Sequence, residues 1–173
     1  MNIQEILNDK LRKPKEKTEV LSQLISEKQL TIDKLIDFAK NAKDADKATC
    51  IEALEFTTQS KPELVDPIAF DFITKCLNEK APRVKWESAK VIGNTAHLNK
   101  NKLNDVIINL LKNSEHQGTV VRWSAAYALG QIIKLQTGIN KSLVPAIEAI
   151  VEREEKNSIK KIYLTALKKI SKK

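Results

Sequence analysis

Two tryptophans in similar surroundings are the side chains best suited to molecular recognition in this sequence. Trp86 lies in VKWESAKVIGN (84–94) and Trp123 in VRWSAAYALGQ (121–131), each directly after a basic residue. Tryptophan and tyrosine dominate binding energies because they bury a large area at a low entropic cost. The two segments therefore predict a binding surface of aromatic and cationic side chains.

Residue types for catalysis or metal binding are sparse. The sequence contains no glycine-rich phosphate loop, no H-E-x-x-H metal motif and no G-x-S-x-G nucleophile motif. Its two histidines, His97 and His116, belong to different segments, and Cys50 and Cys76 form no C-x-x-C pair. Surface histidines and buried, reduced cysteines are the simpler interpretation. We therefore expect no catalytic residue, no metal and no cofactor, and a chain that is not an enzyme.

The two tryptophan segments are copies of one internal repeat. Both read V-[KR]-W-x-[SA]-A-x-[VA]-[IL]-G, and they begin 37 residues apart. Weaker copies begin at Asp46 and Ile159, and a fifth, from Glu16, shares the hydrophobic pattern and one basic residue. The second residue of every copy is basic: Lys17, Lys47, Lys85, Arg122 and Lys160. Repeats at this spacing indicate a stack of similar structural units.

Amphipathic stretches fill the intervals between the copies. Apolar residues recur with the helical period in residues 31–43, 63–79, 101–114 and 140–155. With 4 Gly and 5 Pro in 173 residues, the chain lacks the turn residues of a sheet fold. We expect a single all-α domain over residues 1–173. Its repeats, each a helix pair, should span about 1–28, 31–59, 63–98, 101–136 and 140–171.

This pattern resembles the HEAT repeat, and the sequence is similar to small bacterial HEAT-repeat proteins. The second helix of a HEAT repeat commonly carries V-R-x-x-A-x-x-A-L-G. Residues 121–130 match this motif closely, and residues 84–93 match it well. The resemblance implies an all-α, right-handed α-α superhelix, a HEAT-like solenoid of about five helix pairs. It also implies that the second helices line the concave side.

The resemblance further implies a ladder of ion pairs through the stack. In HEAT repeats an Asp about six residues before the basic residue often pairs with it. The corresponding positions here are Leu11, Asn41, Glu79, His116 and Glu154, so only two carboxylates are available. We expect a partial ladder, with a structural role for its basic residues, Lys47, Lys85, Arg122 and Lys160.

Helical geometry identifies the side of each second helix that points away from the first helices. At about 100° per residue, Trp123 lies opposite a core side formed by Val121, Ala125, Ala128, Leu129 and Ile132. The matched positions along the stack form the expected partner-binding face: Glu52, Glu55, Trp86, Lys90, His97, Trp123, Tyr127, Lys134, Lys161 and Lys168. This face should change from acidic to aromatic, with hollows at Gly93 and Gly130, and then to basic. Whether the tryptophan rings are free or packed between helices stays open.

The distribution of charge separates two hypotheses about function. The net charge is +8, but residues 44–156 contain equal numbers of basic and acidic residues, whereas residues 157–173 contain six lysines and no acid. A protein that follows a phosphate backbone is expected to spread its basic residues along its length. We therefore favour a non-enzymatic scaffold or adaptor that grips a protein or peptide on the concave face. The alternative is a nucleic-acid-binding or DNA-alkylation-repair-like HEAT protein. Against it, we expect no carboxylate on this face in the two tryptophan repeats.

The sequence also carries expectations about location and assembly. It has no apolar run of the roughly 18 residues that span a membrane. Its start, MNIQEILNDK, lacks the apolar segment of a signal peptide. We expect a monomeric cytoplasmic protein that does not bind membranes.

Overall fold

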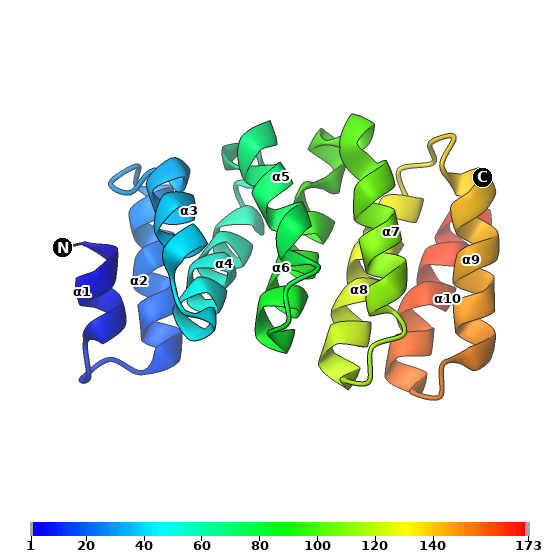
Figure 1. Cartoon of the computed structure of the whole chain (residues 1–173). Helices are drawn as coiled ribbons and strands as arrows, with labels where there is room; N and C mark the ends of the chain where they lie inside the picture. The colour runs from blue at the N-terminus through cyan, green and yellow to red at the C-terminus, as the bar shows by residue number, and fades with distance from the viewer. Residues whose placement is uncertain (1, 172–173) are drawn as a thin grey trace.

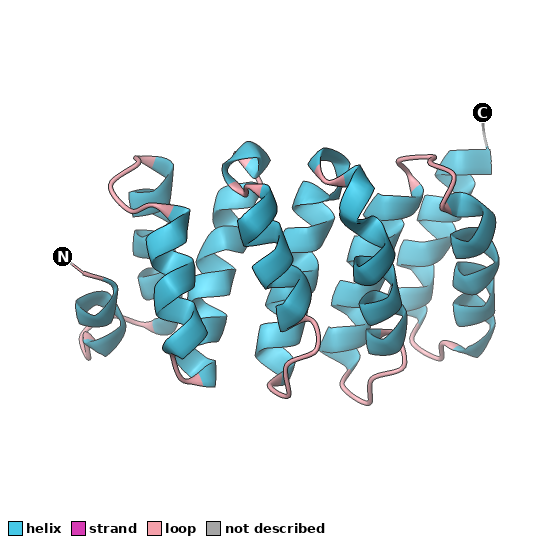
Figure 2. Cartoon of the chain, turned by 45° about the horizontal axis from the view of Figure 1, so that its top comes forward, coloured by secondary structure: helices cyan, strands magenta, loops and turns pink. Residues whose placement is uncertain are grey.

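Helices make up the regular structure of this protein. The computed structural model describes residues 2–171, and these contain ten α-helices and no strand (Figure 2). The first helices of the five pairs are α1 (Ile3–Asn8), α3 (Ile32–Asn41), α5 (Pro67–Cys76), α7 (Leu103–Asn113) and α9 (Asn140–Arg153). The second helices are α2 (Pro14–Ser26), α4 (Asp44–Thr58), α6 (Pro82–Thr95), α8 (Thr119–Ile133) and α10 (Asn157–Ser171). Three short 3-10 turns connect some of them: η1 (Pro62–Leu64), η2 (Ala96–Leu98) and η3 (Lys100–Lys102). The predicted all-α fold is confirmed.

Several helices begin where the sequence supplies a local start signal. Pro14, Pro67 and Pro82 are the first residues of α2, α5 and α6. Proline is tolerated there because an N–H in the first turn has no acceptor within the helix. At the start of α5, the Asp66 side chain also accepts a 2.8 Å hydrogen bond from the backbone N–H of Ala69.

The helix pairs stack in chain order into one elongated array, with the first and last pairs at opposite ends (Figure 1). Each second helix packs against its neighbours of the same kind, in the order α2, α4, α6, α8, α10. These helices form one layer, and α3, α5, α7 and α9 lie in front of it in the view of Figure 1.

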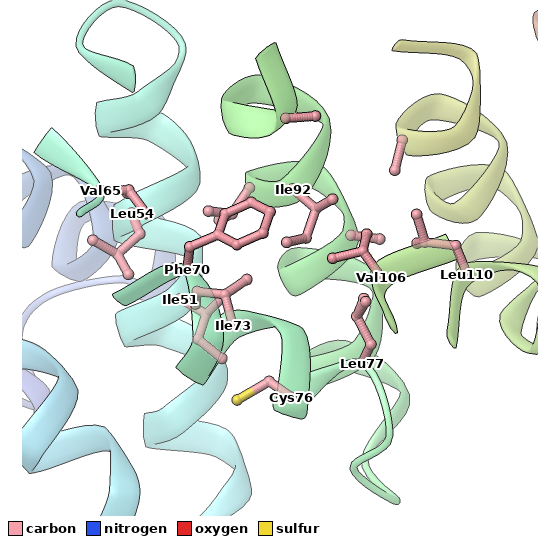
Figure 3. Close-up of a cluster of buried hydrophobic side chains, with 14 of the residues drawn as sticks. Ile51, Leu54, Val65, Phe70, Ile73, Cys76, Leu77, Ile92, Val106 and Leu110 are labelled. Atoms are coloured by element: carbon pink, nitrogen blue, oxygen red, sulfur yellow. The ribbon is translucent and has the colours of Figure 1, made fainter. Parts of the chain in front are cut away.

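An apolar core fills the space between the two layers. Phe70 and Ile73 of α5 gather with Ile51 and Leu54 of α4 and with Ile92 of α6, and all five are buried (Figure 3). The α8 residues expected in the core, Val121, Ala125, Ala128, Leu129 and Ile132, are at most 1% exposed. The helical period therefore identified the core side correctly.

Two features bear on the chemistry available to the chain. Cys50 and Cys76 are buried, and burial raises the pKa of each thiol to about 12. Such thiols carry too little thiolate to be reactive at neutral pH. Within residues 2–171, no cluster of three His, Cys, Asp or Glu side chains is arranged to hold a metal ion.

No described helix is long and apolar enough to cross a membrane.

Candidate binding face

The sides of α2, α4, α6, α8 and α10 that point away from the first helices form a continuous surface, called here the second-helix face. Adjacent second helices join across it through polar side chains. Glu52 of α4 accepts a 2.8 Å hydrogen bond from the Thr18 hydroxyl of α2. The same carboxylate pairs with Arg83 of α6 at 2.7 Å. One acidic side chain thus links three successive repeats.

A compact charge cluster lies on α4 and α6. Lys90 Nζ lies 2.9 Å from Glu87 Oε2 and 3.3 Å from Glu55 Oε2. Trp86 Nε1 donates a 2.7 Å hydrogen bond to Glu87 Oε1. Burial raises the pKa of Glu87 above its usual value. Burial alone would lower the pKa of Lys90, but Glu87 and Glu55 outweigh it and raise that pKa.

These contacts correct the expected acidic end of the face. Glu55 is 5% exposed and lies against Lys90, so its carboxylate is closed off from a partner. Glu52 is half-buried and already paired with Arg83. The carboxylate expected to be missing from the tryptophan repeats is present as Glu87, although that residue is also buried. An acidic surface was expected because each helix was oriented separately, whereas the cations that pair with Glu52 and Glu55 come from the neighbouring helix.

The aromatic centre of the face is held in a fixed orientation. Trp123 and Tyr127 stack with ring centroids 6.1 Å apart and an interplanar angle of 3°. The Tyr127 hydroxyl donates a 2.6 Å hydrogen bond to Asn94 Oδ1 on α6. Asn94 Nδ2 in turn donates to Thr58 Oγ1 on α4 at 3.0 Å. Trp123 remains 39% exposed, whereas Trp86 is half-buried beside Glu87. Trp123 therefore offers the freer ring.

The two glycines do not form hollows, so that prediction was wrong. A Cβ at Gly93 would lie 2.5 Å from Cε1 of Tyr127, because the Tyr127 ring already occupies that space. At Gly130, a Cβ would lie 3.5 Å from the Ala166 Cβ and 3.6 Å from Ile162 Cγ2 of α10. Both glycines are buried contact points between adjacent second helices.

The remaining predicted site residues are one histidine and three lysines. His97 of η2 and Lys161 and Lys168 of α10 are exposed. Lys134, directly after α8, is half-buried. Burial lowers the pKa of Lys134, and the nearby charge of Lys169 lowers it further.

The basic ladder residues join the loops at one end of the stack. Lys47 pairs with Glu79 of the next repeat at 3.0 Å. Lys85 Nζ donates to the Leu77 carbonyl at 3.0 Å and to Asn113 Oδ1 of the next repeat at 3.2 Å. The ladder position of that repeat is His116 and not a carboxylate, and the side-chain amide of Asn113 takes its place as the partner of Lys85.

The last two ladder positions differ from each other. Arg122 Nε pairs with Glu154 Oε2 at 2.9 Å and its Nη1 donates to the His116 carbonyl at 3.0 Å. Lys160, in the fifth pair, makes no side-chain hydrogen bond or ion pair within residues 2–171.

Three residues of this face were not predicted from the sequence: Arg83, Glu87 and Asn94. They lie on the side of α6 that contacts α4, about 60–100° around the helix from Trp86 by the helical period. Their polar types at spacings of four and seven residues were the available signal. In the stack, this polar stripe faces the neighbouring helix α4.

The comparisons with known proteins identify the fold. No family model and no curated protein matches the sequence. A designed armadillo repeat protein in complex with the peptide (KR)4 matches 96% of this chain and 79% of its own, with a TM-score of 0.69 and 17% identity. An engineered protein matches 99% and 80%, with a TM-score of 0.75 and 19% identity. A chain of the CpcE and CpcF complex of phycocyanin lyase from Nostoc sp. PCC7120 matches 95% of both chains, with a TM-score of 0.68 and 15% identity. The protein has the fold of an armadillo-like solenoid of helical repeats.

Proposed function

We propose that this chain is a non-enzymatic scaffold that holds a peptide, or a segment of a partner protein, on its second-helix face. We further propose that its repeats are of the HEAT type and that it acts as a monomer in the cytoplasm. The similarity of the fold to a designed armadillo protein that was solved with a peptide supports a binding role.

The observation that carries the proposal is the orientation of Trp123. Trp123 is 39% exposed, and its ring stacks on Tyr127, whose hydroxyl donates a hydrogen bond to Asn94 of the preceding second helix. A ring held in this way loses little conformational freedom when a partner covers it. Exposed aromatic side chains of this kind are frequent hot spots of protein interfaces.

A DNA-repair activity receives less support from the same face. The two carboxylates nearest to Trp86 and Lys90 are Glu87 and Glu55, and both are buried against Lys90. A carboxylate that activates water must reach the substrate, and these side chains point into the contact between α4 and α6.

Peptide selection followed by substitution tests the proposal. Peptides selected from a displayed random library on the wild-type chain are measured against Trp123→Ala and against the control Ile108→Ala. Ile108 is 65% exposed and lies on α7, in the other layer. We expect Trp123→Ala to weaken binding by roughly 2 kcal/mol, the threshold of a hot spot, and Ile108→Ala to change it little.

Thermal melts of both variants accompany the binding measurements. If Trp123→Ala folds like the wild type and binds the selected peptides equally well, the second-helix face is not the site. If no peptide is selected at all, the proposed binding function is wrong for segments of this kind.

A further inference from the structure

The charges on the α2, α4 and α6 part of the second-helix face are balanced within the chain. Glu52 has Arg83 as its partner, and Lys90 lies between Glu55 and Glu87. A ligand that binds there must displace or bridge pairs that already exist. This part of the face therefore shows little preference for either sign of charge.

The α8 and α10 part of the face is different, because its cations have no acidic partner. Lys134, Lys161, Lys168 and Lys169 make no ion pair with any carboxylate in the described chain. The Nζ of Lys134 has one weak contact, 3.5 Å to Gln131 Oε1. Lys134 and Lys169 are close enough for their like charges to interact.

These cations adjoin the aromatic pair. Trp123 and Tyr127 lie on α8, Lys134 follows directly after this helix, and α10 packs on α8 at Gly130. Trp123 and Lys134 are roughly 16 Å apart along the helix axis, at 1.5 Å per residue. Lys161 occupies on α10 the position of Trp123, about 10 Å away across the helix contact. In an extended peptide these separations correspond to roughly three to five residues.

We propose that the α8 and α10 part of the second-helix face binds an acidic peptide segment with an apolar side chain. The apolar side chain covers Trp123, and carboxylates three to five positions away meet Lys134, Lys161 and Lys168. This inference rests on the proposed peptide-binding function and names the class of partner. The charge preference is opposite to that of the basic peptide (KR)4 seen with the designed armadillo protein.

Fluorescence anisotropy with two labelled peptides tests this preference. One peptide has Asp and Glu on both sides of a single Leu, and the other has Lys and Arg at the same positions. The proteins are the wild type, Lys134→Gln/Lys168→Gln, and the control Lys112→Gln/Lys141→Gln. The control lysines are exposed on α7 and α9 and give the same change in net charge.

We expect the acidic peptide to bind the wild type at least tenfold more tightly than the basic one. Its affinity should fall as salt is added, because charge pairs at an interface rim are screened. Lys134→Gln/Lys168→Gln should weaken it about tenfold, and the control pair should weaken it much less. Trp123→Ala should also weaken binding of the acidic peptide, and this loss should be about the same at low and at high salt.

Other outcomes overturn the inference in recognisable ways. Equal losses in the two double variants would mean that net charge alone attracts the peptide. Tighter binding of a duplex DNA oligonucleotide, with the same dependence on Lys134 and Lys168, would make this a nucleic-acid surface. Equal binding of both peptides, still lost in Trp123→Ala, would leave the proposed function standing and remove the charge preference. Unchanged binding in Trp123→Ala and in both double variants would contradict both the proposed binding face and its preference for acidic peptides.

Discussion

Arg122 of α8 joins the fourth helix pair to the fifth through Glu154, which follows α9 directly. The Nε to Oε2 distance is 2.9 Å, and the Glu154 side chain is 4% exposed. The same guanidinium also binds the carbonyl oxygens of His116 and Gln117. One side chain therefore ties together the loops of two repeats.

Replacing Arg122 should lower stability, because the buried Glu154 would lose its partner. We expect Arg122→Ala to reduce the free energy of unfolding by about 1–3 kcal/mol, the cost of an unsatisfied buried polar group. Lys160→Ala is the matched control at the same position of the last repeat, and its effect should stay within about 0.5 kcal/mol. Urea denaturation measures both. Equal effects of the two substitutions would contradict the role of Arg122 in the ladder.

The contribution of Glu154 should depend on pH. Burial raises its pKa, but the hydrogen bonds from Arg122 and from the Lys156 backbone outweigh burial and leave the pKa below the usual 4.5. A carboxylate with a lowered pKa in the folded state stabilises the fold above its unfolded pKa and loses this effect as the pH falls through its folded pKa.

Glu154→Gln separates this contribution from the others. The difference in unfolding free energy between wild type and Glu154→Gln should be complete at pH 7 and shrink progressively below about pH 4.5. Urea denaturation at several pH values measures it. A difference that stayed constant down to pH 3 would show that the charge of Glu154 adds nothing.

Gly93 and Gly130 should respond to alanine with opposite signs. At Gly93 the added methyl would meet the Tyr127 ring at 2.5 Å and force it away from Asn94, so we expect a loss of about 1–3 kcal/mol. At Gly130 the nearest atoms would be at 3.5 Å, an ordinary contact. Alanine is also preferred to glycine within a helix by roughly 1 kcal/mol, so Gly130→Ala should stabilise the fold. Thermal denaturation measures the melting temperatures of the two variants. A shift of both in the same direction would contradict this explanation.

Removal of the last helix tests whether the five repeats form one cooperative unit. Ala166 and Ile162 of α10 cover Gly130 of α8, and Tyr163 of α10 is itself buried. A chain that ends before residue 157 would expose that side of α8. Since repeats are stabilised mainly by their neighbours, we expect lower solubility and a lower melting temperature. Size-exclusion chromatography and melting curves measure both, and an unchanged monomer would contradict the single-unit interpretation.

The sequence by itself determined the helices and the side of each helix that is buried. The match between residues 84–94 and 121–131 revealed the repeat, and the helical period placed Val121, Ala125 and Leu129 in the core. These inferences succeed because they depend on local geometry. A helix repeats every 3.6 residues, whatever lies beside it, and apolar residues on one side must be covered.

Only the tertiary structure decided which polar residues remain available to a partner. Lys90 of α6 covers the carboxylate of Glu55 on α4, and the Tyr127 ring of α8 fills the space beside Gly93 on α6. Trp123 stays exposed while Trp86 turns to Glu87, although the two occupy equivalent positions in the repeat. The projection of one helix contains no information about its lateral neighbours. Their separation and rotation set which side chains meet, and they follow from the packing of the whole stack.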